Sequence, residues 1–207
     1  MKTLIVALRV TAVTLVVTGL IYPLVMTGIS KALLHDRANG SMVTNDKGQV
    51  VGSELIGQNF EQAGYFRPRP SAAGDKGYDA TNSGGSNLGP TSKKLRDRVT
   101  ESVAKLKKQN PDARGHVPAE LVTASASGLD PHLSPAGAMW QVPRVARARG
   151  VSQERVRQLV EANIEGRDLG FLGEPRVNVL LLNLALDRQF GAVQRTEEKK
   201  SAEQSTR

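Results

Sequence analysis

The chain has 207 residues, of which 39% are hydrophobic and 23% charged, as in a single globular domain. It has no cysteine, which excludes disulfides, cysteine-based zinc sites and thiol catalysis. The formal net charge is +8, but the basic residues are spread out, without interleaved aromatic residues or a nucleic-acid-binding motif, so we expect no nucleic-acid partner.

An uncharged run over residues 10–30 is long enough to cross a membrane as a helix. The alternative is a cleaved signal peptide, whose apolar region is usually shorter. We predict a short N-terminal tail (1–9), a transmembrane anchor helix (10–30), a soluble domain (31–191) and a disordered charged tail (192–207).

The charges that flank the span indicate its orientation. Lys2 and Arg9 precede the span, whereas Lys31 and Arg37, offset by Asp36, follow it. Basic residues favour the cytoplasmic side, and long domains cross largely regardless of their charge. We therefore expect a single-pass protein of the bacterial cytoplasmic membrane with its soluble domain on the extracytoplasmic side.

One stripe of the span suits contact with another membrane helix. At about 100° per residue, Thr11, Thr14, Thr18 and Tyr22 lie on one face. The alternative is that each threonine bonds to a preceding carbonyl of its own helix and lipid surrounds the rest. Pro23 is expected to kink the helix or to end its regular part.

Residues 41–60 have the pattern of short strands. A hairpin is predicted in which residues 42–44 and 49–51 flank a turn at 45–48. Residues 118–122 are expected to lead into another short extended piece.

The stretch 64–90 is rich in Gly, Pro, Ser, Asn and Asp, which predicts either disorder or a functional loop wrapped over the surface. Tyr65, Phe66 and Tyr78 favour the wrapped loop, because each aromatic ring can anchor it to the core.

Apolar periodicity and capping residues predict four further helices. They are expected over residues 92–108, 136–149 (kinked or divided by Pro143), 152–164 and 178–190. Together with the hairpin they indicate an α+β fold, in which a single N-terminal transmembrane helix is followed by one small mixed domain with several helices around a short sheet.

The sequence contains no catalytic or metal-binding constellation. Gly84 and Gly89 have the spacing of a phosphate-binding loop, but Pro90 follows where that loop requires lysine. The three histidines are separated by gaps that suit no metal motif. A free-standing anchored enzyme such as a hydrolase is therefore disfavoured.

Two segments are explained by packing. The small residues 123–128 indicate close approach of the backbone rather than a nucleophile. In the helix that follows, Met139 and Trp140 are expected in the core, with Gln141 and Arg144 on a different face.

Several short blocks follow one another in order behind the single span. They are QNF (58–60), GYF (64–66), RPSA (69–72), SGGSNL (83–88), ELVTASASGLD (120–130), WQVPRVA (140–146), VNV (177–179) and NLALD (183–187). In combination they resemble the C subunit of the potassium-transporting Kdp P-type ATPase, over roughly residues 1–191.

The resemblance implies membership of a high-affinity, ATP-driven potassium uptake complex. The expected partners are a channel-like potassium-translocating subunit, a P-type ATP-hydrolysing subunit and a small single-span subunit. This sequence lacks the aspartyl-phosphate signature of the pump and the many spans of a pore, so we expect a non-enzymatic accessory subunit.

The resemblance leaves two accounts of the accessory role open. In the structural account, the chain stabilises assembly of the channel-like and P-type subunits. In the other it is a catalytic chaperone that raises the ATP affinity of the pump subunit, with Gln141 as the nucleotide contact. No cofactor is expected to bind to this chain alone, and ATP is expected to bind only where the pump subunit is also present. A neutral glutamine cannot hold a triphosphate unaided, which favours the structural account.

The residues expected at partner interfaces come from the span, the glycine-rich loop and the small-residue segment. They are Thr11, Thr14, Thr18, Tyr22, Arg69, Ser83, Gly84, Gly85, Ser86, Asn87, Ser125, Ser127 and Asp130.

Overall fold

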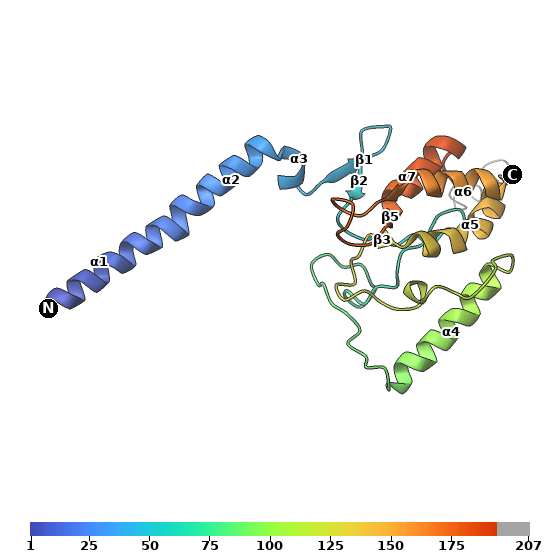
Figure 1. Ribbon diagram of the computed structural model, residues 1–207, viewed down its shortest axis with the longest axis horizontal. Helices are drawn as coiled ribbons and strands as arrows, with labels where there is room; N and C mark the ends of the chain where they lie inside the picture. Colours follow the sequence, from blue (N-terminus) through green and yellow to red (C-terminus); the bar gives the residue numbers. More distant parts are fainter. Residues whose placement is uncertain (194–207) are drawn as a thin grey trace, which may run out of the picture.

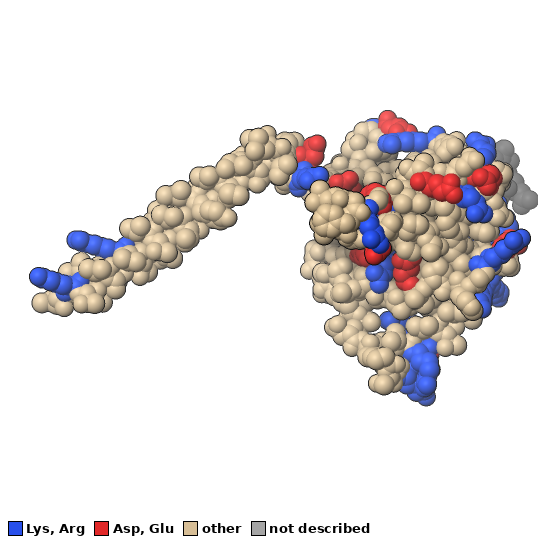
Figure 2. Space-filling model, viewed as in Figure 1, with Lys and Arg blue, Asp and Glu red and all other residues tan. Residues whose placement is uncertain are grey.

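The apolar N-terminus forms one continuous helix that stands clear of the folded domain in the computed structural model, which describes residues 1–193 (Figure 1). The helix comprises α1 (Lys2–Val16), a π-helical turn η1 (Val17–Ile21) and α2 (Tyr22–Leu33). It is long and apolar enough to cross a membrane, and none of its residues is buried. Figure 2 shows its middle without charged side chains. The predicted N-terminal tail is helical from Lys2 and continuous with the span.

The helix continues through Pro23, and its irregularity is the wide turn just before that residue. Proline lacks an N–H, and its ring crowds the carbonyl four residues earlier, at Gly19. In the π-helical turn the Tyr22 N–H reaches back five residues to the Val17 carbonyl. One extra residue per turn rotates the following side chains by about 100°. Tyr22 is therefore displaced from the stripe predicted for the threonines.

A short connection joins the span to the predicted hairpin. After α3 (His35–Ala38), strands β1 (Met42–Thr44) and β2 (Val50–Ser53) pair antiparallel, which confirms the hairpin. Asn45 Oδ1 accepts hydrogen bonds from the main-chain N–H groups of Lys47 and Gln49 and closes the turn.

The rest of the domain places helices around a small second sheet, and the α+β prediction is confirmed. The remaining elements are α4 (Lys93–Gln109), a 3₁₀ turn η2 (Ala119–Leu121), β3 (His132–Leu133), α5 (Pro135–Arg149), α6 (Gln153–Ala162), β4 (Ile164–Glu165), β5 (Arg176–Asn178) and α7 (Val179–Phe190). β5 lies between β3 and β4 and pairs antiparallel with both.

Side-chain caps fix the predicted helix starts. Ser92, Ser134, Ser152 and Asn178 each accept a hydrogen bond from the N–H three residues later. Pro143 lies inside α5 without dividing it. Two local predictions are wrong: residues 118–122 form a 3₁₀ turn instead of an extended piece, and Ile164 lies in β4 instead of the preceding helix.

The core lies between α5, α6, α7 and the three-stranded sheet. Its fully buried side chains include Val142, Val145, Val156, Val160, Val177, Leu182 and Leu186. By contrast, α4 has no buried residue, and its apolar stripe is only half-buried. The predicted tail 192–207 lies outside the described residues, apart from Ala192 and Val193.

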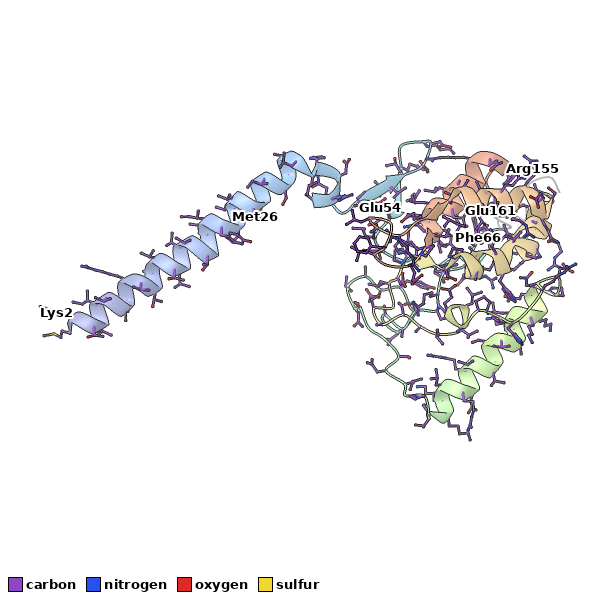
Figure 3. The ribbon with its side chains drawn as sticks, in the orientation of Figure 1. Lys2, Met26, Glu54, Phe66, Arg155 and Glu161 are labelled. Atoms are coloured by element: carbon purple, nitrogen blue, oxygen red, sulfur yellow. The ribbon has the colours of Figure 1, made fainter. Side chains whose placement is uncertain are left out.

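The stretch 64–90 is an ordered loop wrapped over the domain, as its aromatic residues predicted. The Phe66 ring, labelled in Figure 3, is fully buried in the core. Asn183 of α7 accepts a hydrogen bond from the Phe66 N–H at 2.8 Å and donates one to the Phe66 carbonyl at 2.9 Å. The Asn183 amide thus pairs both the N–H and the carbonyl of Phe66, as a neighbouring strand would.

Replacing Asn183 with leucine should therefore destabilise the domain. The variant Asn183→Leu keeps the branched shape of the side chain but leaves two buried main-chain groups unpaired, which costs about 3 kcal/mol. Thermal unfolding of the full chain in detergent, followed by near-ultraviolet circular dichroism, measures the change. The control Gln189→Leu, exposed on the same helix, should change stability by under about 0.5 kcal/mol. Equal melting temperatures for the two variants would contradict the role of Asn183.

Candidate functional site

The glycine-rich loop and the small-residue segment lie directly against each other. The Gly84 N–H donates to the Ser127 carbonyl at 2.9 Å, and Ser83 Oγ donates to the same oxygen at 3.0 Å. A Cβ atom on Gly85 would lie 2.8 Å from the Ala126 carbonyl oxygen, and one on Gly128 would lie 2.6 Å from that of Gly84. The close backbone packing predicted for residues 123–128 is thus confirmed, and it explains both sets of small residues. We call this contact the glycine junction.

A serine hydroxyl connects a third segment to the glycine junction. Ser71 Oγ donates to the Gly128 carbonyl at 2.6 Å and accepts from the N–H groups of Ala73 and Tyr78 at 3.1 and 2.7 Å. The Tyr78 hydroxyl donates to the Arg69 carbonyl at 2.7 Å. Burial raises the pKa of Tyr78 to about 12, so this phenol remains a donor at physiological pH.

An ion pair closes the other side of the junction. Arg69 lies 3.1 Å from the carboxylate of Asp130 and also donates to the Ala124 carbonyl at 3.4 Å. Asp130 accepts a hydrogen bond from the His132 N–H at 3.0 Å. Hydrogen bonding from His132, followed by that from Arg69, lowers the pKa of the Asp130 carboxyl below its ordinary value.

The structure brings most of the predicted interface residues together, but not all of them are accessible. Arg69, Asp130, residues 83–85 and residues 125–127 lie at the glycine junction, and Ser86 and Asn87 follow directly in the loop. Ser83, Asn87 and Ser127 are exposed there, whereas Ser125 is buried. The predicted stripe on the span is fully exposed and lies apart from the junction, and Thr18 Oγ1 donates to the Thr14 carbonyl at 2.7 Å.

Gln141 is buried, in contrast to the face predicted for it, and its amide is occupied within the domain. It is only 2% exposed. Its Oε1 accepts from the Arg67 N–H at 2.9 Å and from Arg144 at 2.7 Å, while its Nε2 donates to the Arg67 carbonyl at 3.0 Å. Gln141 therefore binds Arg67 in the way that Asn183 binds Phe66.

Arg144 is also buried, and this too corrects the prediction. Its guanidinium donates to the carbonyls of Ala63 and Tyr65 at 2.6 and 3.0 Å. Burial, followed by the nearby charges of Arg67 and Arg147, lowers the pKa of Arg144 to about 10. The charge is stabilised by main-chain dipoles, because none of the ion pairs within residues 1–193 involves Arg144.

Sequence reasoning missed a second set of contacts at the start of the loop. The Tyr65 hydroxyl donates to Asp187 at 2.8 Å, and Arg149 binds the other oxygen of that carboxylate at 2.8 Å. The Arg149 guanidinium also lies over the Tyr65 ring, 4.9 Å from its centre. Tyr65 lies in the GYF block and Asp187 in the NLALD block, and membership of these two blocks was the only sequence feature that could have indicated the contact.

The described site consists of closely packed irregular segments. Within the part of the chain that the structure describes, no three His, Asp or Glu residues are grouped as metal ligands. A hollow of about 950 Å³ is lined by Arg114, His116 and Trp140, among others, and includes neither Gln141 nor the glycine junction.

Comparison with known proteins identifies the relatives of this chain. The family model described as "KdpC: K+-transporting ATPase, c chain" matches residues 4–188. A potassium-transporting ATPase KdpC subunit from Myxococcus xanthus is 64% identical over 190 residues, covering 92% of this chain and 90% of the relative. One from Koribacter versatilis is 54% identical over 187 residues, covering 90% of this chain and 94% of the relative.

Because the backbones at the glycine junction are so close, adding one methyl group at Gly128 should strongly destabilise the domain. In Gly128→Ala, the positive φ of 67° adds strain and the new Cβ meets backbone atoms, so the domain should lose about 3 kcal/mol of stability. The control Gly150→Ala has a similar φ of 65° but open space, and should lose only about 1 kcal/mol. Urea unfolding of the full chain in detergent separates the two. Equal losses would show that the close approach is unimportant.

The ionised Asp130 carboxylate should make the free energy of unfolding fall at acidic pH. Because its folded-state pKa is lowered, the carboxylate stabilises the fold above its ordinary pKa, and this contribution is lost as the pH falls through the folded-state value. Asp130→Asn should lose about 1 kcal/mol at neutral pH and should show a shallower decline in stability below about pH 4 than the wild type. Melting temperatures between neutral and acidic pH measure both effects. Parallel pH profiles would contradict the role of this carboxylate.

Proposed function

The chain belongs to the KdpC family of potassium-transporting ATPase subunits, and on that basis we propose that it stabilises the assembly of a channel-like subunit with a P-type, ATP-hydrolysing subunit. Membership makes it an accessory subunit of a potassium uptake complex. In our proposal the chain itself catalyses no reaction, and a small single-span subunit is a further partner.

The observation that carries this proposal is the uncovered apolar helix. Residues 2–33 make no buried contact with the domain, so lipid or the helices of other subunits must cover them. Small and hydroxyl-bearing residues such as Thr11, Thr14 and Gly19 allow close approach of a second membrane helix. The span thus offers a surface for a partner within the membrane.

The contacts of Gln141 support the structural role over the chaperone role. Both ends of its amide are already bonded to Arg67, and the adjacent Arg144 is bonded to the loop carbonyls. A triphosphate at Gln141 would have to displace these bonds and part of the loop. The charges that flank the span further support an extracytoplasmic domain, where ATP is scarce.

The structural account assumes that the domain lies outside the cytoplasm, and this can be tested by labelling. A single cysteine replaces Gln158, an exposed residue on α6, in a chain that otherwise has none. We expect an impermeant maleimide to label it in intact cells. Protection that disappears on lysis would place the domain inside and make the chaperone account the better one.

The assembly role predicts that bulk on the threonine stripe weakens the complex. Thr14→Leu with Thr18→Leu blocks close approach, and recovery of the intact complex in detergent should fall roughly three- to tenfold. The control, Ala12→Leu with Val16→Leu, has the same spacing on the opposite face of the helix and should leave recovery unchanged.

Two readouts of the same variants separate the two roles. Assembly predicts lower recovery of the complex, while whatever complex remains keeps the KM for ATP of the wild type. Unchanged recovery for the threonine variant would contradict the proposal, and a raised KM with full recovery would support the chaperone account.

A further inference from the structure

The connection between β4 and β5 exposes three large apolar side chains. Leu169, Phe171 and Leu172 are 82%, 69% and 49% exposed. The chain has only four phenylalanines, and Phe60, Phe66 and Phe190 all pack in or against the core. The domain has few aromatic residues, yet it exposes one of them at the end of a loop. Nothing in its own fold accounts for this apolar surface. We call residues 168–172 the apolar tip.

The apolar tip is a turn closed by main-chain hydrogen bonds. Asp168 and Leu172 exchange two main-chain hydrogen bonds, both of 2.9 Å. The Phe171 N–H donates to the Asp168 carbonyl, and the Gly170 N–H to that of Arg167. Leu169 adopts a positive φ of 53°, which is unusual for a leucine and is stabilised by this turn. Four of the five N–H groups of the tip are thus paired within the turn, which lowers the hydrogen-bonding cost of leaving water.

Charged residues form a paired collar below the tip. Arg176 binds Glu165 at 2.9 Å and Asp168 at 3.2 Å, and Arg167 binds Glu174 at 2.8 Å. Each charge of this collar already has an opposite charge within the connection. Its three carboxylates share two guanidinium groups, so each charge has an opposite charge beside it, and such a layer beneath an apolar tip suits the polar region of a lipid bilayer.

The apolar tip lies on the side of the domain where the chain leaves the membrane. Asn178, at the end of β5, donates to the Glu54 carbonyl just after β2 at 2.7 Å. Glu54 and Met42 line a shared hollow with Leu33 and Leu34 at the end of the span. In Figure 1 the β4–β5 connection lies beside the β1–β2 hairpin on the side toward α2 and α3, and Figure 2 shows an uncharged bulge there, bordered by charged side chains.

We propose that the apolar tip enters the interfacial layer of the same membrane that the N-terminal helix spans. The partner is the lipid surface itself, and Phe171 is the principal contact because a large apolar ring can be buried at the boundary between headgroups and acyl chains. Only residues 34–41 separate the span from β1, so the domain is held close to that surface. With the span and the tip both in the bilayer, the domain has two attachments and a fixed orientation. This inference rests on membrane anchoring and not on the proposed assembly role.

The test uses a fluorescent reporter in the full chain without its partner subunits. Phe171→Trp is reconstituted into vesicles of phosphatidylethanolamine and phosphatidylglycerol that carry brominated acyl chains. The native Trp140 is buried and gives a constant background. The control is Glu161→Trp, an exposed position on α6, which Figure 3 shows far from the span residues Lys2 and Met26.

Insertion predicts that the indole at position 171 emits at shorter wavelength and is quenched by brominated lipid, while the control is not. Leu169→Trp is a second reporter in the same turn, and it should be quenched as well. Quenching no greater than that of the control at both tip positions would overturn the proposal. So would a shift to shorter wavelength that appears only after partner subunits are added, because the tip would then bind protein instead of lipid.

Discussion

The domain depends on one constraint: the main chain around Phe66 enters the core without a neighbouring strand. Buried main-chain groups must be paired, and here side chains pair them. Asn183 and Gln141 each bind the N–H and carbonyl of one residue, and Arg144 binds two carbonyls. Two helices thereby hold an irregular segment as a sheet would.

The remainder of the loop follows from this attachment. Once Phe66 is fixed in the core, the chain that follows passes Arg69 and Ser71 and reaches the glycine junction. There the absence of side chains lets two backbones meet, so the surface of the domain is set by close packing of irregular segments. A surface of this kind has a defined shape with little regular structure beneath it, which suits an accessory subunit of a multi-subunit complex.

The parts of the fold that sequence analysis predicted correctly are those with local causes. Ser92, Ser152 and Asn178 cap their helices through contacts three residues away, and Asn45 closes its own turn. The small residues 123–128 also indicated close packing correctly. The buried positions of Gln141 and Arg144 were missed, because a polar residue on a helix is assigned to the surface unless a distant partner is known. The three strands of the second sheet are two or three residues long, too short for an alternating pattern.

The amide contacts also constrain the order in which the domain can be made. Asn183 and Phe66 are 117 residues apart in the chain, and Gln141 and Arg67 are 74 apart. During synthesis the span and the loop emerge before α5 and long before α7, so Phe66 lacks its Asn183 partner until almost the whole chain has left the ribosome. Pairings so distant in sequence form slowly, because the intervening chain must first be closed into a loop. The domain therefore completes folding after its anchor has been made, and a protein truncated before α7 would retain the anchor but lose the ordered loop.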